Sequence, residues 1–325
     1  MSDVLEKMKE AILSQHKIAI ISHSNPDGDT LGSQLALANA VSQFGIETRL
    51  INESHVSPKF YFLPMSQDIR PLEAEESLPE VVVFVDCATL ERAAMEPYQE
   101  RLAGKTLLNL DHHPSNNAFG TLNYVVSQAA ANCQVVYELL EVMGVELTPD
   151  VATALYLGLS TDTGSFLFDS VSANTHRLAA ILIDAHADTS AIRNNLYEST
   201  SRAKFELQKH IFNNTQISAD GKLAWSSFDR ALLKRTQADS ADIDGLINSI
   251  KNIEGVEIAI LFREMEQERV KISFRSKVWA DVNQLAACFG GGGHIRAAGC
   301  TLLEAMETVQ DKVLRAAEAV LAKGE

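Results

Sequence analysis

Short and almost uninterrupted apolar runs recur along the first half of the chain, and each ends in polar residues. KIAIIS at 17–22, ETRLI at 47–51, VVVFVD at 81–86 and KTLLNL at 105–110 predict buried strands. Strands covered on both faces lose the alternation of polar and apolar positions, and these runs show little of it. Segments with helical spacing lie between them, at 30–44 and 128–143. This order predicts βαβ units and a mostly parallel sheet.

The pattern continues with a well-marked helix and then with a second α/β region. Thr148 and Pro149 are typical of a helix start, so a helix is expected from about 149 to 160, followed by helical stretches near 174–187 and 191–213. Further on, KLAWSSF, VEIAILFRE and RVKISFRS predict strands, and helices are expected at 281–288 and 304–321. We therefore predict an α/β protein with a mostly parallel-sheet domain over 1–190, a helical linker over 191–215 and a smaller α/β domain over 216–325.

Acidic and imidazole side chains follow these apolar segments at four separate places. They are His23, Asp27 and Asp29; Asp86; Asp111, His112 and His113; and Asp162. The carboxyl ends of parallel strands meet at one edge of a sheet, where ligands of open α/β proteins bind. Residues far apart in the sequence are therefore expected to meet at that edge.

The residue types indicate which chemistry such a site would support. Carboxylate oxygens and imidazole without thiolate suit Mn²⁺ or Mg²⁺, with Co²⁺ or Zn²⁺ as substitutes. A carboxylate such as Asp86 can bridge two cations, as in enzymes that hydrolyse phosphoesters with a metal pair. Each aspartate also has a simpler interpretation, since Asp29 stands where a helix N-cap is expected and Asp162 where a turn could close. The occurrence of four such clusters favours the metal interpretation.

Charge and composition narrow the class of substrate. The chain has 325 residues and a net charge of -15, and residues 1–190 carry ten Lys and Arg against twenty-five Asp and Glu, whereas residues 191–325 carry eighteen of each. Long polyanions bind through many basic residues, so small substrates are favoured over long duplex nucleic acid.

No apolar run is long enough to span a membrane, and the first residues form a charged amphipathic segment rather than a signal peptide, so a cytoplasmic protein is expected.

Five motifs of the chain resemble those of a known family. HSNPDGD, the single Asp86 after a valine-rich run, DHHPSN and STDTG resemble the motifs of the DHH phosphoesterase superfamily, in the same order. FGGGGHIRAAG at 289–299 resembles the glycine-rich motif of its DHH-associated domain. The two-domain layout is similar to that of the NrnA group of oligoribonucleases and 3′-phosphoadenosine 5′-phosphate (pAp) phosphatases.

The resemblance implies two divalent cations, most simply Mn²⁺, with Asp86 between them. His23, Asp27 and Asp86 would hold one, and Asp29, Asp86, His112 and Asp162 the other. His113 would face the substrate phosphate, and Asp111 would orient a histidine or a water. With Asp86, they form the expected catalytic set.

Substrate contacts are expected in the second domain. Glycine-rich segments let backbone N–H groups converge on an anion, and neighbouring cationic side chains add donors. The expected contacts are Arg275, Ser276, Gly291, Gly292, Gly293, His294 and Arg296.

The expected activity is hydrolysis of short RNA or DNA oligonucleotides to monophosphates, together with conversion of pAp to AMP. Alternatives are a linear or cyclic dinucleotide phosphodiesterase, a RecJ-like single-strand exonuclease, and a nucleotide-sensing module without turnover. Relatives usually carry a Ser-Thr pair and a Glu where this chain has Ala131, Asn132 and Gln134, which bears on substrate preference. Family relatives are often dimers, so a homodimer is an open expectation.

Overall fold

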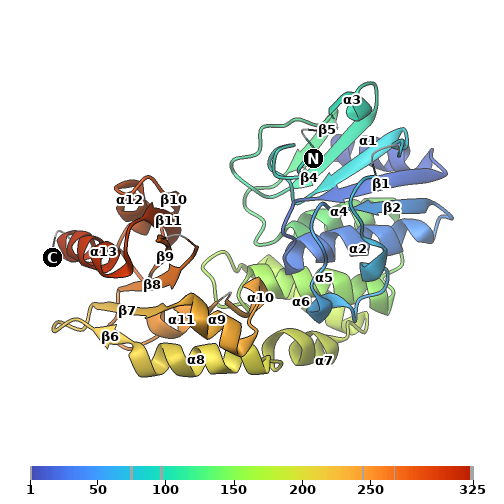
Figure 1. Ribbon diagram of the computed structural model, residues 1–325. Helices are drawn as coiled ribbons and strands as arrows, with labels where there is room; N and C mark the ends of the chain where they lie inside the picture. The colour runs from blue at the N-terminus through green and yellow to red at the C-terminus, as the bar shows by residue number, and fades with distance from the viewer. Residues whose placement is uncertain are drawn as a thin grey trace. The chain divides into compact units, whose positions relative to one another are not determined.

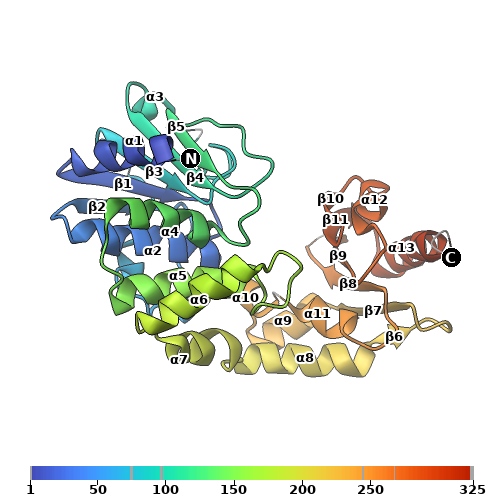
Figure 2. The same cartoon turned by 180° about the vertical axis from the view of Figure 1, so that it is seen from behind.

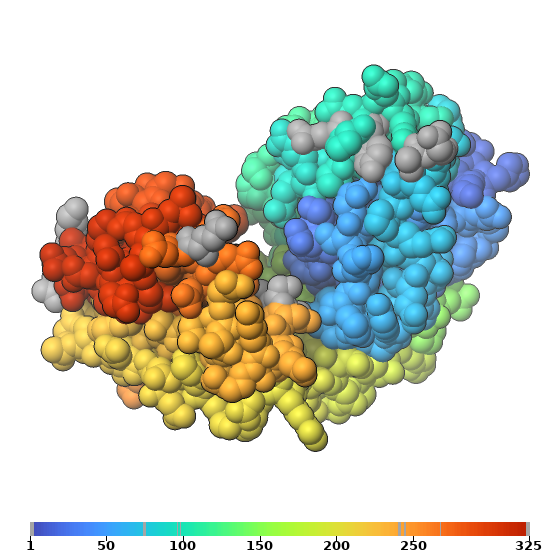
Figure 3. Space-filling view, viewed as in Figure 1, coloured from blue at the N-terminus to red at the C-terminus, as the bar shows by residue number. Residues whose placement is uncertain are grey.

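The computed structural model describes residues 2–73, 76–95, 97, 99–243, 245–266 and 268–322. The chain divides into two compact units, residues 1–199 and 200–325. Figures 1 and 2 show their elements from opposite sides, and Figure 3 shows their atoms. The interval 191–215, where a linker is expected, is shared between the units, because helix α8 (Arg202–Asn214) lies in the second.

The first unit is built on a five-stranded sheet that is parallel throughout. Its order is β2-β1-β3-β4-β5, and the strands are β1 (Lys17–Ser22), β2 (Glu47–Ile51), β3 (Val81–Val85), β4 (Thr106–Asp111) and β5 (Leu122–Val125). Four of these strands are the ones that the apolar runs predict. Strand β5 is not among the predicted strands; two of its four residues are half-buried, one is buried and one is exposed.

Both faces of this sheet are covered, which explains the uninterrupted apolar runs. In β3, Val81, Val83 and Val85 belong to a core formed with the helices, whereas Val82 and Phe84 belong to a second core beneath the loops. The helices of this unit are α1 (Ser2–Leu13), α2 (Gly28–Ser42), α3 (Gln99–Leu102), α4 (Asn132–Met143), α5 (Pro149–Asp162), α6 (Ala173–Asp184) and α7 (Thr189–Ile192), with short 3-10 turns at Pro58–Phe60 and Ser66–Asp68 and a π-helical turn at Arg193–Tyr197.

Helices α2 and α5 pack closely because glycine stands at their contact. A Cβ on Gly158 would lie 2.2 Å from Cys133 Sγ and 2.6 Å from Asp29 Oδ1, and one on Gly32 would lie 2.5 Å from the Ala154 carbonyl oxygen. Any larger residue would push the helices apart. The start of α2 and the end of α5 are thereby held next to each other, and both carry acidic residues.

The second unit contains a mixed six-stranded sheet in the order β10-β11-β9-β8-β7-β6. The strands are β6 (Gln216–Ile217), β7 (Leu223–Phe228), β8 (Ile258–Glu264), β9 (Arg269–Ser276), β10 (Gly292–His294) and β11 (Ala297–Leu303), of which only the β7–β8 pair is parallel. The remaining helices are α9 (Arg230–Thr236), α10 (Ser240–Ile243), α11 (Leu246–Lys251), α12 (Val282–Ala287) and α13 (Met306–Leu321).

The two faces of the second sheet are covered by different helices. Residues of α12 and α13 pack with Ile272 and Phe274 of β9 on one face, and residues of α8 and α11 pack with Ala259 and Leu261 of β8 on the other. An α/β fold for both units agrees with the prediction. Among the described residues, we find no helix with the length and hydrophobicity needed to cross a membrane.

Candidate metal and active site

The candidate ligands lie where strands and helices of the first unit end. His23 follows β1, Asp86 follows β3, and Asp111 is the last residue of β4. Asp27 and Asp29 stand at the start of α2, and Asp162 is the last residue of α5. The parallel sheet and the close α2–α5 contact therefore bring these side chains together, as the sequence pattern suggests for a shared edge.

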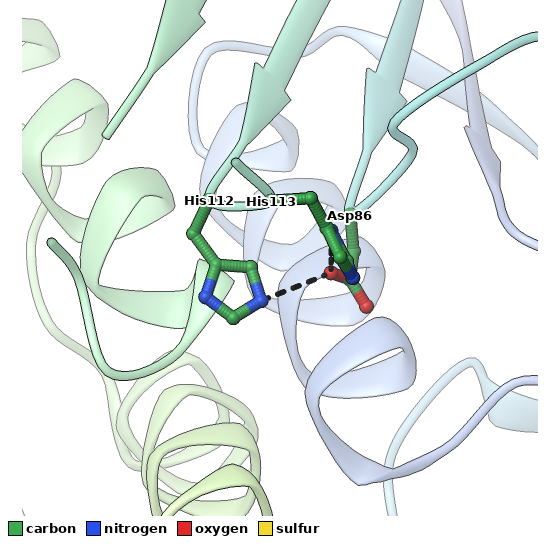
Figure 4. A group of neighbouring side chains, drawn as sticks. All are labelled: Asp86, His112 and His113. Atoms are coloured by element: carbon green, nitrogen blue, oxygen red, sulfur yellow. Dashed lines mark ion pairs between the residues drawn. The ribbon is translucent and has the colours of Figure 1, made fainter. Parts of the chain in front are cut away.

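Asp86 lies at the centre of the cluster. Its Oδ1 is 3.5 Å from His112 Nε2 and 3.6 Å from His113 Nδ1, and both imidazoles point at this oxygen in Figure 4. Asp86 is 3% exposed and adopts a left-handed backbone conformation with φ of 58°. Aspartate tolerates this conformation better than most residues, and here it turns the chain sharply at the end of the strand.

A first group of ligands forms around Asp86 Oδ2. His23, Asp27 and Asp86 each offer one atom within 4.8 Å of the others. The Thr30 hydroxyl lies among them, 2.6 Å from His23 Nε2, 2.9 Å from Asp27 Oδ1 and 2.7 Å from Asp86 Oδ2. A hydroxyl has one hydrogen, so it cannot donate to all three acceptors. Thr30 is not among the residues predicted for the site, although its place three residues after Asp27 marks the first helical turn.

A second group consists of Asp29, His112 and Asp162, again within 4.8 Å. His112 Nε2 is 3.9 Å from Asp29 Oδ2 and 3.6 Å from Asp162 Oδ2. Asp86, which the resemblance assigns to both cations, lies between the two groups through its contacts with His23 and His112.

The helix caps differ from the simple expectation for Asp29. Asp27 is the N-cap of α2 and accepts the backbone N–H groups of Asp29 and Thr30. Asp29 instead accepts the N–H groups of Asn132 and Cys133, at the start of α4. A carboxylate is favoured at a helix N-terminus, so α4 holds Asp29 in a fixed orientation. Asp29 can therefore both cap α4 and act as a metal ligand.

Backbone carbonyls fix the orientation of two imidazoles. His23 Nδ1 is 2.8 Å from the Ser24 carbonyl oxygen, and His112 Nδ1 is 3.2 Å from the Ala129 carbonyl oxygen. A carbonyl only accepts, so each Nδ1 carries hydrogen and, in the neutral ring, Nε2 keeps its lone pair. Metal-binding histidines are commonly held in this way.

Asp111 and Asn116 hold the remaining histidine. His113 Nδ1 is 2.8 Å from Asp111 Oδ1, and Asn116 Nδ2 donates to Asp111 Oδ2 at 2.7 Å. Asn116 also donates to the side-chain oxygen of Asn109. The His113 ring is about one-third exposed, whereas Asp111 is fully buried. Asp111 thus lies behind His113, and Asn116, at the end of the DHHPSN motif, was missed as a positioning residue.

Burial, repulsion between the carboxylates and attraction by the imidazoles shift the pKa values of the cluster, and the imidazoles lower the pKa of Asp86. Burial raises the pKa of Asp29 well above its usual value, and Asp86 and Asp162 add to the shift. Burial also raises the pKa of Asp162 to about 6. Burial lowers the pKa of His112, but hydrogen bonding to Asp86 and the surrounding carboxylates outweigh it, so this pKa rises to about 10. The carboxylates of the site thus carry more negative charge than its imidazoles can balance.

These residues fit a pair of hard divalent cations. The donor set is carboxylate oxygen and imidazole nitrogen, which suits such ions. Asp86 Oδ1 is buried and, apart from the long contacts with His112 and His113 at 3.5 and 3.6 Å, has no hydrogen-bond partner among the described residues, although buried carboxylate oxygens normally have one. A cation would satisfy this oxygen and the three acceptors around Thr30.

The expected substrate residues of the second unit lie in three different settings. Arg275 and His294 lie on adjoining parts of the sheet, since Ala297 pairs with both residues. Ser276 is 3% exposed and belongs to the opposite face of β9 from Arg275, because successive strand residues alternate. Arg296 donates to the Ala280 carbonyl oxygen at 2.8 Å, which ties two loops together.

The last two residues of the glycine run, Gly292 and Gly293, belong to strand β10 of a tight hairpin, and Gly291 immediately precedes it. A Cβ on Gly291 would lie 2.2 Å from the Gly299 carbonyl oxygen, and one on Gly293 would lie 2.5 Å from the Ala297 carbonyl oxygen. The approach of β10 to β11 therefore requires glycine at these positions. Gly292 is exposed, and a Cβ there would lie 3.7 Å from Asn283 Oδ1, an ordinary contact distance.

Comparison with known proteins assigns the chain to a family. Residues 17–159 match the DHH family N-terminal domain, and residues 224–323 match the DHHA1 domain. The chain belongs to the DHH family of phosphoesterases, as the motifs predict.

Within this family, the chain is similar to curated proteins named bifunctional oligoribonuclease and PAP phosphatase NrnA. It is 31% identical to the protein from Thermus thermophilus, covering 88% of this chain and 84% of that protein. It is 29% identical to the one from Bacillus subtilis, covering 88% and 89%.

Solved structures support the fold. An exopolyphosphatase-related protein from Bacteroides fragilis matches with a TM-score of 0.89 and 23% identity, covering 99% of this chain and 96% of that one. The RecJ–Mn²⁺ complex from Thermus thermophilus matches with a TM-score of 0.56 and 12% identity, and the match covers 54% of RecJ.

Proposed function

We propose that this chain is a metal-dependent phosphoesterase that cleaves short oligonucleotides to nucleoside monophosphates and converts pAp to AMP. The observation that carries the proposal is the convergence of carboxylates and imidazoles from four separate segments around the buried Asp86. The named activities of the NrnA relatives support the substrate class.

In this proposal, His23, Asp27 and Asp86 hold one divalent cation, and Asp29, Asp86, His112 and Asp162 hold the other. Manganese suits this mixed set, and Mg²⁺, Co²⁺ or Zn²⁺ are the alternatives. Such a pair supplies an activated water near neutral pH and neutralises phosphoryl oxygens. The chain contributes fixed ligand orientations, through the Ser24 and Ala129 carbonyls.

His113 and Asp111 act on the substrate phosphate. With Nδ1 directed at the Asp111 carboxylate, a protonated His113 presents Nε2–H as a donor. This donor would bind a phosphoryl oxygen or protonate the departing ribose oxygen. Asp111 fixes the orientation of the ring through its hydrogen bond with Nδ1.

The second unit would bind the rest of the nucleotide in this proposal. His294 and Arg275 supply cationic or polar donors, and the exposed backbone at Gly292 and Gly293 can approach a phosphate without side-chain obstruction. Arg296 and Ser276 would act at most indirectly, because one is tied to a carbonyl and the other is buried.

A substrate panel separates this proposal from its rivals. Purified protein with Mn²⁺ is incubated with pAp, linear and cyclic dinucleotides, five-nucleotide RNA and long single-stranded DNA. The highest rates are expected for dinucleotides, short RNA and pAp. A preference for cyclic dinucleotides or long DNA would favour the dinucleotide phosphodiesterase or the RecJ-like exonuclease, and binding without turnover would favour a sensing module.

The decisive variant is Asp86→Ala. It should lose at least about 100-fold in Mn²⁺-dependent hydrolysis, in the range seen when one essential catalytic group is removed. A circular dichroism spectrum should remain that of the unchanged protein. Asp184→Ala, which removes an exposed acid at the end of α6, is the matched control and should retain activity. Full activity of Asp86→Ala would refute the proposed site.

A further inference from the structure

One part of the second sheet has an uncovered face. On β9, Ile272 and Phe274 pack against the core beneath α12 and α13, so their neighbours project to the other side. On that side Arg269 and Lys271 are exposed, as are Thr301 and Leu303, which pair with them on β11. The helices of this side pack mainly over β7 and β8.

This face carries a row of cations. Arg263 of β8 lies directly opposite Lys271 of β9, and Arg269 follows on the same face two residues from Lys271. We call Arg263, Lys271 and Arg269 the basic strip. At its other end, two strand positions beyond Ser273, lies Arg275, which borders the glycine hairpin.

The strip is electrostatically unbalanced. Like charges directly opposite each other on antiparallel strands are destabilising, and Arg263 and Lys271 form such a pair. Among the described residues, the ion pairs include none that neutralises the strip: the nearby Glu266 pairs with Arg230. Arg263 Nε is buried without a hydrogen-bond partner in the described part of the chain. An anion would relieve both problems.

The surface is also hollowed along the strip. Arg263 lines a hollow of about 590 Å³ together with the cations Arg230, Lys234 and Arg269, which outnumber the two acids of its lining, Glu264 and Glu266. It also lines a smaller one of about 150 Å³ together with Lys271, Ser273 and Arg275. Two adjoining hollows thus share Arg263, and cations line them from Arg275 to Arg269.

The spacing suits a single-stranded nucleic acid. Side chains on one face of a strand recur at every second residue. Two extended residues contain as many backbone bonds as one extended nucleotide, so the two repeats are similar in length. The phosphates of an extended strand can therefore meet successive cations. Since the unit as a whole is neutral, with seventeen basic and seventeen acidic residues over 200–325, this row concentrates positive charge locally.

We propose that the basic strip binds phosphodiester groups of a single-stranded oligonucleotide other than the one cleaved, and so sets how affinity depends on substrate length. This inference rests on the proposed function and adds a subsite to it. A dinucleotide has only the phosphodiester group that is cleaved and pAp has none, whereas a five-nucleotide RNA has three further phosphodiester groups to place there.

The test compares two double variants with equal loss of charge. R269Q/K271Q removes two exposed members of the strip and spares the partly buried Arg263. K312Q/R315Q removes two exposed cations from α13, on the other side of the sheet. For each, KM and kcat are measured for five-nucleotide RNA, a dinucleotide and pAp, and RNA binding is measured by fluorescence anisotropy in EDTA at several salt concentrations.

R269Q/K271Q should raise KM for the five-nucleotide RNA at least about fivefold at low salt. The slope of log affinity against log salt concentration should also become shallower, by the amount expected for the loss of about two phosphate contacts. Turnover of the dinucleotide and pAp should stay within about twofold. Three results would overturn the proposed role of the basic strip. They are an unchanged KM for RNA, an equal loss of activity on all substrates, and an equal effect of K312Q/R315Q. Failure of the proposed function can be told apart from failure of the strip. If the proposed function is wrong, the unmodified protein cleaves none of the substrates, but the anisotropy measurement still shows whether the strip binds RNA.

Discussion

Asp29 Oδ1 accepts a hydrogen bond from the backbone N–H of Cys133 at 2.9 Å, across 104 positions of sequence. The other carboxylate oxygen accepts from Asn132. Asp29 therefore joins the first turn of α2 to the first turn of α4. It does so as a fully buried acid near two other carboxylates, so the contact that organises the site also concentrates negative charge in it.

We expect Asp29→Asn to separate these two effects. Asparagine removes a buried charge that Asp86 and Asp162 repel, so the metal-free variant should unfold at a higher temperature than the unmodified protein at pH 8. A gain of about 1 kcal/mol would correspond to about 2–4 °C for a unit of this size. Asparagine has only one acceptor oxygen for the two N–H groups at the start of α4, and the lost hydrogen bond offsets part of the gain in stability.

The same variant should lose the stabilisation that Mn²⁺ gives the unmodified protein, because it lacks one ligand. Differential scanning fluorimetry in EDTA and in MnCl₂ measures both effects. A Mn²⁺-induced increase equal to that of the unmodified protein would show that Asp29 is no ligand.

Thr30 provides a second test of the first ligand group. Thr30→Val keeps the shape but removes the hydroxyl that lies within 2.9 Å of His23, Asp27 and Asp86. We expect Mn²⁺ affinity to fall about 10- to 100-fold, as for other groups that orient metal ligands. Thr30→Ser, which keeps the hydroxyl, should bind almost normally. Isothermal titration calorimetry with MnCl₂ measures the difference, and equal affinities of Val and Ser variants would contradict it.

Asp111→Asn should act on His113 rather than on metal binding. An asparagine that still accepts from Asn116 must turn its NH₂ group toward His113 Nδ1, so Nδ1 can no longer carry the hydrogen that the protonated ring of the proposed function requires. We expect kcat to fall about 10- to 100-fold with the Mn²⁺ midpoint unchanged. Steady-state kinetics over a range of MnCl₂ and pH check this. A shifted Mn²⁺ midpoint with normal kcat would instead make Asp111 part of the metal site.

The metal-free protein should lose stability as pH rises from 6 to 8. The folded-state pKa of His112 is raised from its usual value of 6.5 to about 10, and that of His23 is also raised from 6.5, so both contributions are lost within or above this pH range. A group whose pKa is raised by folding stabilises below its unfolded pKa, and this contribution is lost as pH rises toward the folded value. Mn²⁺ should reverse the trend, since it replaces protons. Unfolding temperatures at pH 6, 7 and 8, with EDTA or MnCl₂, test this; a metal-free protein that is more stable at pH 8 contradicts it.

Much of the first unit follows from local sequence. The runs that became β1 and β3 are apolar on both faces, and Thr148 with Pro149 marks the start of α5, where the Thr148 side chain accepts the Val151 N–H. Helix α2 begins at Gly28 rather than at the predicted residue 30, because Asp27 and not Asp29 is its cap. Such boundaries depend on which of several capping residues is used.

The sequence by itself determined the α/β class, the family and the chemical type of the candidate ligands, because these depend on local apolar patterns and on residues within short motifs. Only the tertiary structure decided that Asp29 is held by α4, that Thr30 lies among three acceptors and that Ser276 is turned away from Arg275. It also placed Arg263 opposite Lys271. These relations depend on strand register and helix contacts between distant segments, and no local pattern encodes which segments meet.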